Sequence, residues 1–157
     1  MLIALFAVVP PAARGQAAVA DNQLRVGLTI GSTSFVGLTV EYFWDVRRSV
    51  DLSLGTWSLR DFSVSGVVKQ YVGGDDNVRA YVGLGIWNVT AWQEEGRGTA
   101  FILRAPIGGE VGGRNAFGAE LSVSKALYIR RSDPEDDTPP AARIVPLPGF
   151  YYRWAAR

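Results

Sequence analysis

Apolar residues alternate with small or polar residues along most of the chain, from about residue 24 to residue 154. Between Val78 and Ile86, for example, every second residue is apolar, and the residues between them are arginine, tyrosine and glycine. A period of two places successive side chains on opposite faces, so it predicts β-strands. Turn-forming residues separate the stretches. The eight strands predicted in this way are residues 24–31, 35–44, 50–59, 62–72, 78–90, 99–111, 116–129 and 144–154.

The charged residues fall on the face opposite the continuous apolar face in nearly every predicted strand. A soluble barrel with a dry core has the reverse arrangement, so this polarity predicts an outer surface that meets lipid. An open sheet edge in hydrocarbon would leave backbone groups unpaired at a cost of several kcal/mol each, so the sheet must close. The sequence therefore predicts an all-β fold, a closed, antiparallel, up-and-down transmembrane β-barrel of eight strands.

The predicted outward face carries large apolar side chains on every strand, and its aromatic residues cluster toward the strand ends. Such rings suit the headgroup level of a bilayer. These aromatic residues are Tyr42, Trp44, Tyr128, Tyr152 and Trp154. Lys125 also falls on this face, and a lysine at the bilayer midplane costs about 2–4 kcal/mol. We therefore expect Lys125 either near the outer interface or next to a bulge that changes the alternation.

The predicted inward face carries five cations and four anions. In a narrow lumen these opposite charges can form ion pairs with one another. They are Arg25, Glu41, Asp51, Lys69, Arg79, Arg104, Glu110, Glu120 and Arg153. The aromatic residues predicted inside are Phe35, Phe43, Trp57, Tyr71, Tyr81 and Tyr151. An eight-stranded barrel is only just wide enough for its side chains, so we expect a plugged lumen with structural ion pairs. A gated or narrow polar path through these residues is the alternative.

Glycines on the inward face leave room for these large side chains in a tightly curved sheet. They are Gly27, Gly31, Gly37, Gly55, Gly83, Gly85 and Gly108. No predicted helix follows Gly83-Leu84-Gly85, so this segment does not indicate a phosphate-binding loop.

The chain contains no histidine and no cysteine, which excludes Ser-His-Asp and Cys-His catalysis and removes the usual nitrogen and sulfur metal ligands. The acidic segments at residues 75–76 and 133–137 lack the spaced oxygen ligands of a calcium loop, and we interpret them as solvated turns. A net charge of +1 provides no basic face for nucleic acid. We expect no enzyme activity, no metal, no cofactor and no nucleic-acid partner.

The first 20 residues are typical of an export signal. A short apolar core at residues 2–9 is followed by two prolines and by Ala18-Val19-Ala20, a small-x-small cleavage pattern, although no Lys or Arg precedes the core. Residues 1–20 are therefore predicted as a signal peptide and residues 21–157 as one barrel domain. From a periplasmic N-terminus, residues 45–49, 73–77 and 112–115 form short periplasmic turns, and the two longest connections, 93–98 and 130–143, lie outside.

Three segments resemble small bacterial outer-membrane β-barrels of the OmpA-like and OmpX-like superfamily. They are Tyr81-Val82-Gly83-Leu84-Gly85, residues 103–111 with residues 117–123, and the last strand, Pro148-Gly149-Phe150-Tyr151-Tyr152-Arg153-Trp154. The resemblance implies a location in the bacterial outer membrane and an assembly signal at Phe150, Tyr152 and Trp154 that the barrel-assembly machinery reads. The chain departs from the pattern because Ala155, Ala156 and Arg157 follow the last aromatic residue.

Three functions remain open. The first is a small monomeric outer-membrane barrel with a plugged lumen and a structural, adhesive or surface-interaction role. The second is a transport protein for a small or hydrophobic solute. The third is a soluble lipocalin-like ligand carrier, which Gly55-Thr56-Trp57 suggests, although lipocalins carry this tripeptide at their first strand and here it lies in the third.

Overall fold

The computed structural model of the protein describes residues 22–74, 77–93, 96–131 and 143–156. The predicted signal peptide and the acidic segments at 75–76 and 133–137 lie outside these residues. The strands are β1 (Gln23–Gly31), β2 (Ser34–Asp45), β3 (Arg48–Thr56), β4 (Asp61–Gly74), β5 (Val78–Gln93), β6 (Gly96–Val111), β7 (Ala116–Arg130) and β8 (Ile144–Ala155). The described residues contain no helix that is long and apolar enough to cross a membrane.

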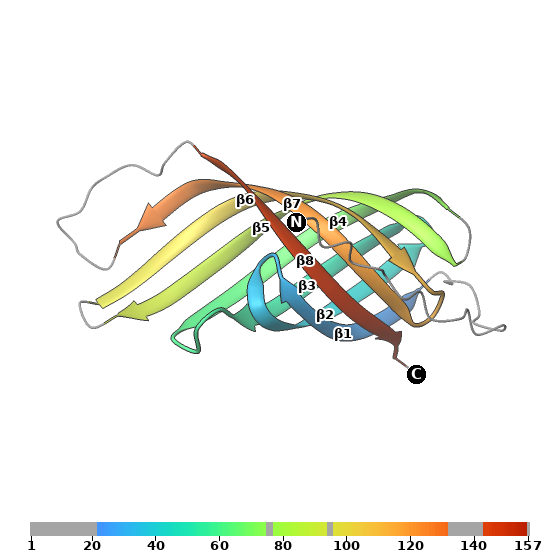
Figure 1. The fold of residues 1–157 in the computed structure, drawn as a ribbon, viewed down its shortest axis with the longest axis horizontal. Helices are drawn as coiled ribbons and strands as arrows, with labels where there is room; N and C mark the ends of the chain where they lie inside the picture. The colour runs from blue at the N-terminus through green and yellow to red at the C-terminus, as the bar shows by residue number, and fades with distance from the viewer. Residues whose placement is uncertain (1–21, 75–76, 94–95, 132–142, 157) are drawn as a thin grey trace, which may run out of the picture.

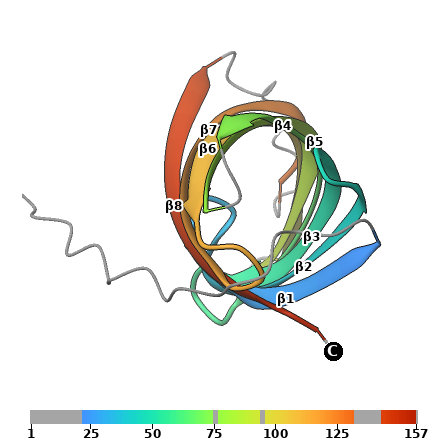
Figure 2. The same ribbon diagram turned by 90° about the vertical axis from the view of Figure 1, so that its right-hand side faces the viewer.

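Each strand pairs in antiparallel fashion with its neighbour in the sequence, and β1 pairs with β8 to close the sheet. The closing register runs from Arg25 opposite Ala155 to Gly31 opposite Gly149. Figure 1 shows the tilted strands from the side, and Figure 2 shows the ring from one end, where β1 meets β8. The predicted fold, a closed antiparallel barrel of eight strands in sequential order, is confirmed.

The two ends of the barrel differ. One end, the turn end, carries the β2–β3, β4–β5 and β6–β7 connections, the start of β1 and the end of β8. The opposite end, the loop end, carries the other four connections. At the loop end β5 and β6 stay paired as far as Gln93 opposite Gly96, whereas the β1–β2 hairpin closes at Gly31 opposite Ser34. The barrel wall is therefore taller at β5–β7, which reach past the β1–β2 hairpin in Figure 1.

The period-two pattern separates the two faces of the sheet as predicted. Fully buried side chains are mostly charged, hydroxyl-bearing or aromatic, whereas large apolar side chains are exposed on all eight strands. On β5, for example, Leu84 is 59% and Ile86 61% exposed. Lys125 is exposed on the outward face, opposite Ile144 at the loop end of β8, close to a register shift between β6 and β7. Lys125 therefore keeps the outward position that the alternation predicts, and a bulge lies next to it.

Phe35 points outward, so its predicted place in the lumen is wrong. The register between β1 and β2 shifts between Thr29 opposite Gly37 and Gly31 opposite Ser34, which leaves two β2 residues, Phe35 and Val36, facing one β1 residue. This bulge changes the alternation. As a result Phe35 and Val36 are both exposed, at 62% and 50%.

Trp57 also lies outside the lumen, because β3 ends at Thr56 and not at residue 59 as predicted. A turn follows in which Asp61 accepts hydrogen bonds from the backbone N–H groups of Trp57, at 2.8 Å, and Ser58, at 2.9 Å. Trp57 is 42% exposed, and its indole N–H donates to the carbonyl of Thr33 in the β1–β2 turn at 3.0 Å. These hydrogen bonds to Asp61 favour a turn after Thr56, although the alternating pattern of the sequence continues to residue 59.

Candidate functional site

The structure brings the nine charged residues predicted for the lumen together inside the barrel. Eight of them are buried, and the side chain of Glu120 is 10% exposed. Since a buried ion costs several kcal/mol unless it is paired, the contacts around each charge decide whether the arrangement is stable. Seven of the residues form one connected network, and Arg104 and Glu120 form a separate pair.

Glu110 on β6 holds two guanidinium groups at the turn end. Its Oε1 lies 2.9 Å from Nη1 of Arg25 and 2.6 Å from Nη2 of Arg79. The same arginines also donate to turn carbonyls, Arg25 to Gly113 at 2.6 Å and Arg79 to Val46 at 3.2 Å. Glu110 therefore fixes two arginines that hold the β6–β7 and β2–β3 turns against the lumen.

Glu41 and Asp51, on neighbouring strands, share two cations. Lys69 Nζ lies 3.5 Å and Arg153 Nη1 lies 3.4 Å from Glu41, and both side chains also contact Asp51. The hydroxyl of Thr39 donates to Asp51. Because Arg153 comes from β8 and Asp51 from β3, this cluster crosses the lumen. Figure 2 shows how far apart these strands lie around the ring.

Arg104 and Glu120 form the pair nearest the loop end, and three serines complete their contacts. Arg104 donates to the hydroxyl groups of Ser122 at 3.2 Å, Ser65 at 3.1 Å and Ser32 at 3.0 Å. Ser32 in the β1–β2 turn donates to Glu120 at 2.7 Å. The pair therefore ties this turn to strands on the other side of the barrel.

Four aromatic rings form a column between these charges. The ring centroids of Phe43 and Tyr71 lie 5.4 Å apart, those of Tyr71 and Tyr81 lie 5.4 Å apart, and those of Tyr81 and Tyr151 lie 6.5 Å apart. The guanidinium carbon of Arg79 lies 4.0 Å from the centroid of Tyr71. Cation–π contacts of this kind favour a desolvated cation by about 2 kcal/mol or more. The four predicted inward aromatics other than Phe35 and Trp57 thus line the lumen.

The tyrosine hydroxyl groups also donate hydrogen bonds to the carboxylates. Tyr71 donates to Glu41 at 3.0 Å, and Tyr81 donates to Glu120 at 2.9 Å. A carboxylate with two cations and a hydroxyl donor has most of its acceptor sites occupied. The aromatic column and the ionic network are therefore one hydrogen-bonded structure.

Inward serine and threonine residues are the part of this network that the sequence reasoning missed. These buried hydroxyl-bearing residues include Thr39, Ser49, Ser63, Ser65, Ser122 and Ser124. Most of them bond charged groups, as Ser49 does when it donates to Glu41 at 2.8 Å. The same alternation that assigns the charged residues to the inward face also assigns these small polar residues to it, so the sequence pattern could have predicted them.

A small polar cavity lies among the charged residues of the lumen. This cavity, among Asp51, Lys69, Arg104, Glu120 and Arg153, has a volume of about 10 Å³, which is room for about one water molecule. Among the described residues, no group of three or more His, Cys, Asp or Glu residues is arranged to hold a metal ion. The arrangement can neutralise charge across the barrel and bind water.

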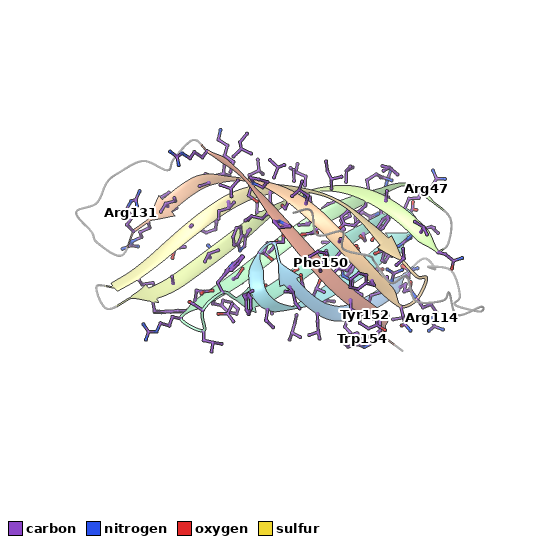
Figure 3. The ribbon with its side chains drawn as sticks, in the orientation of Figure 1. Arg47, Arg114, Arg131, Phe150, Tyr152 and Trp154 are labelled. Carbon is purple, nitrogen blue, oxygen red and sulfur yellow. The ribbon has the colours of Figure 1, made fainter. Side chains whose placement is uncertain are left out.

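The three residues of the predicted assembly signal share the outward face of β8. Phe150 is 53%, Tyr152 is 47% and Trp154 is 39% exposed. Figure 3 shows them in a row toward the turn end. The rings of Tyr152 and Trp154 lie 6.1 Å apart. They are separated by the inward Tyr151 and Arg153, so one strand carries both an apolar outer edge and part of the lumen.

Comparison with known proteins gives the fold and little else. No protein-family model and no curated protein matches the sequence. Among solved structures, the chain is similar to the crystal structure of the N-terminal β-barrel domain of Pseudomonas aeruginosa OprF, with a TM-score of 0.63. The alignment covers 87% of this chain and 98% of the OprF domain at 14% sequence identity. The predicted resemblance to small eight-stranded barrels of this type is therefore confirmed at the level of fold.

Proposed function

We propose that this chain is a small integral β-barrel protein of the bacterial outer membrane. The observation that carries the proposal is the inverted polarity: charged residues are buried in the lumen, and large apolar side chains are exposed on every strand. In water this outer surface would be unfavourable at roughly 25 cal/mol per Å² of apolar area, whereas in hydrocarbon it is the favoured solvent contact. The shared fold with the OprF domain supports the same conclusion.

The dimensions also support a bilayer-spanning role. The strands contain 9 to 16 residues, and a tilted strand needs about 9–11 to cross a bilayer. Over the closing register, pairing of β1 with β8 removes the free sheet edge. The unpaired backbone groups of such an edge would be costly in hydrocarbon. By these criteria the chain needs no partner subunit to complete its wall, which supports a monomer.

We further propose that the lumen is sealed and that the protein has a structural or surface-interaction role. The connected ion pairs, the column of four rings and a cavity of about one water support a sealed lumen. In this proposal the contacts with other molecules are made by the outer surface and the loop end, with the lumen as the internal brace. A catalytic role has no support in this arrangement.

A conducting or transporting barrel is the second candidate, because the cavity is polar and lies among charges from several strands. Conductance in planar bilayers separates the two. The sealed-lumen proposal predicts no stable single-channel steps, and regular ohmic steps would replace it with the second candidate. A soluble carrier is disfavoured, since its ligand cavity would be lined by the buried charges while the apolar faces met water.

The outward row of Phe150, Tyr152 and Trp154 on β8 supports a proposal about biogenesis. We propose that the barrel-assembly machinery reads this row as an assembly signal. Changing the row to serine in cells should reduce the amount of barrel in the outer membrane. Serine at Val82, Leu84 and Ile86 on the outward face of β5 should reduce that amount less, and equal loss in both variants would contradict the proposal.

Fractionation combined with gel mobility tests the main proposal. A folded membrane barrel stays in the detergent-extracted outer-membrane fraction and migrates faster on a denaturing gel before boiling than after it. Recovery of the protein in the soluble periplasmic fraction, with one mobility in both states, would refute membrane residence.

A further inference from the structure

The outward face of the taller wall carries a patch of cations and aromatic rings at the loop end. We define this loop-end patch as Trp92, Arg97, Phe101, Lys125, Tyr128 and Arg130. All six side chains are exposed, and the three rings are 46–53% exposed. The residues come from three adjacent strands, β5, β6 and β7.

Cross-strand pairing places these residues in rows. Phe101 on β6 lies opposite Tyr128 on β7, and their ring centroids are 6.3 Å apart. Arg97 lies opposite Trp92, with its guanidinium carbon 5.9 Å from the indole ring. Residues two apart on a strand share a face and lie roughly 6.5–7 Å apart. The arginine row is therefore one or two steps beyond the aromatic row.

Arg130 belongs to the same outer edge, because it lies opposite Thr99, one step from Arg97 along the outward face of β6. Diagonal neighbours in adjacent strands lie about 7–8 Å apart, which long side chains can bridge. Arg97 and Arg130 can thus contact one anion together. Two guanidinium groups in this relation match the geometry of a phosphate group.

Polarity along this face changes in one direction. Leu103 opposite Lys125 ends the apolar belt, the Phe101–Tyr128 pair follows, and the arginines lie beyond. A membrane boundary has the same order: hydrocarbon, then interface, then headgroup phosphate. None of Arg97, Lys125 and Arg130 forms an ion pair with a carboxylate among the described residues.

The turn end of the barrel also carries exposed cations. Arg48 lies opposite Asp45 in the β2–β3 hairpin, and its Nε donates to Gln70 at 3.1 Å. Arg47 and Arg114 lie at this end, opposite the end that carries Arg131 (Figure 3). They therefore offer a control pair with the same charge, at the other rim.

From this arrangement we propose that the loop-end patch binds the phosphate-bearing headgroup of an anionic membrane lipid. Arg97 and Arg130 contact the phosphate, the Phe101 and Tyr128 rings pack against the glycerol and upper acyl region, and Lys125 supplies a second cation at the edge of the hydrocarbon. The proposal rests on the proposed function, because it requires the apolar belt to lie in a bilayer. It adds a selective lipid site to that function.

Native mass spectrometry of the folded chain, released from non-ionic detergent micelles doped with phosphatidylglycerol or phosphatidylcholine, tests the site. We expect bound phosphatidylglycerol in preference to phosphatidylcholine. The double variant R97Q/R130Q should bind phosphatidylglycerol about 25-fold more weakly, because each cation near an anionic surface contributes about fivefold. The control variant R47Q/R114Q should bind as the unchanged chain does.

Three results would overturn the proposal: equal binding of the two lipids, equal losses in the two double variants, or displacement of the lipid by millimolar inorganic phosphate. The last result would indicate a site for free phosphate. Heat-dependent gel mobility is recorded for every variant. If the unchanged chain lacks the fast-migrating form, the proposed membrane barrel is contradicted. If the unchanged chain has this form but binds both lipids equally, only the lipid site is contradicted.

Discussion

Replacement of Glu110 by glutamine tests how strongly the lumen network holds the barrel together. The change keeps the size of the side chain but removes the negative charge between Arg25 and Arg79, whose nitrogens lie 2.9 and 2.6 Å from Oε1. The next carboxylate is Glu41, at 4.0 Å from Arg25. Among the described residues, Arg79 would keep only neutral partners, the carbonyl of Val46 and the rings of Phe43 and Tyr71.

Two independent estimates of the loss agree. Removing one partner of a buried ion pair costs about 3–5 kcal/mol. A pair of unit charges about 4 Å apart at an effective dielectric constant of 20 interacts with about 4 kcal/mol. We therefore expect Glu110→Gln to lower the free energy of unfolding by about 3–5 kcal/mol. A loss of that size is a large part of the roughly 5–15 kcal/mol that stabilises a typical domain.

Urea unfolding of the refolded chain in lipid vesicles, followed by tryptophan fluorescence, measures this loss. Asp45→Asn, at an exposed turn carboxylate, is the matched control and should cost about 1 kcal/mol or less. In the double variant E110Q/R79Q the loss should be smaller than the sum of the single losses by about 1–3 kcal/mol, since the stranded cation is removed. A loss for Glu110→Gln no larger than that of the control would refute the view that these ion pairs brace the lumen.

Three further predictions follow from the packing of the two faces. A Cβ on Gly108 would lie 2.6 Å from the hydroxyl of Tyr81, whereas one on its outward neighbour Gly109 would meet nothing closer than 3.5 Å, so Gly108→Ala should lower stability by about 1–3 kcal/mol and Gly109→Ala by much less. Equal urea midpoints for the two variants would contradict the tight inner packing. Leu84→Arg on the outward face should cost about 2–4 kcal/mol in vesicles, and no loss there would argue against contact with lipid. Ser32→Ala removes a hydroxyl shared by Arg104 and Glu120, so it should lower stability by about 1–3 kcal/mol. The same change should increase proteolysis at the β1–β2 turn. The control Ser58→Ala, in the exposed β3–β4 turn, should leave the β1–β2 turn protected.

The sequence predicts most of this architecture because a period of two is a local property of a strand. Eight alternating stretches correspond to the eight strands, and the same alternation assigns the nine charged residues to the interior. The chemistry of a closed sheet in hydrocarbon then requires a barrel, so no contact between distant residues needs to be known.

The errors arise where pairing between strands overrides the local pattern. Phe35 follows the alternation of β2 alone, but the bulge opposite Ile30 turns it outward. Trp57 lies past a strand end that the Asp61 carboxylate sets through hydrogen bonds to turn N–H groups. A bulge and a side-chain-bonded turn depend on register and on residues several positions away, which periodicity does not report.

Within the lumen, the sequence indicates which residues meet but not which partners they take. Arg25 pairs with Glu110, on the other side of the barrel, at 2.9 Å, and lies 4.0 Å from Glu41, its partner in the β1–β2 register. The partner depends on the shear of the barrel and on the room that inward glycines leave. Those quantities are set by all eight strands together.

The central claim is that the outward faces of the strands lie in hydrocarbon, and the absence of cysteine from the chain allows a direct measurement. Single cysteines at Val82, Leu84 and Ile86 on the outward face of β5 are treated in intact vesicles with a charged, water-soluble maleimide, and Arg114→Cys in an exposed turn serves as the accessible control. The account predicts that the three β5 cysteines stay unmodified until the chain is unfolded in detergent, while the turn cysteine reacts at once. Reaction of the β5 cysteines at the rate of the turn cysteine would contradict it.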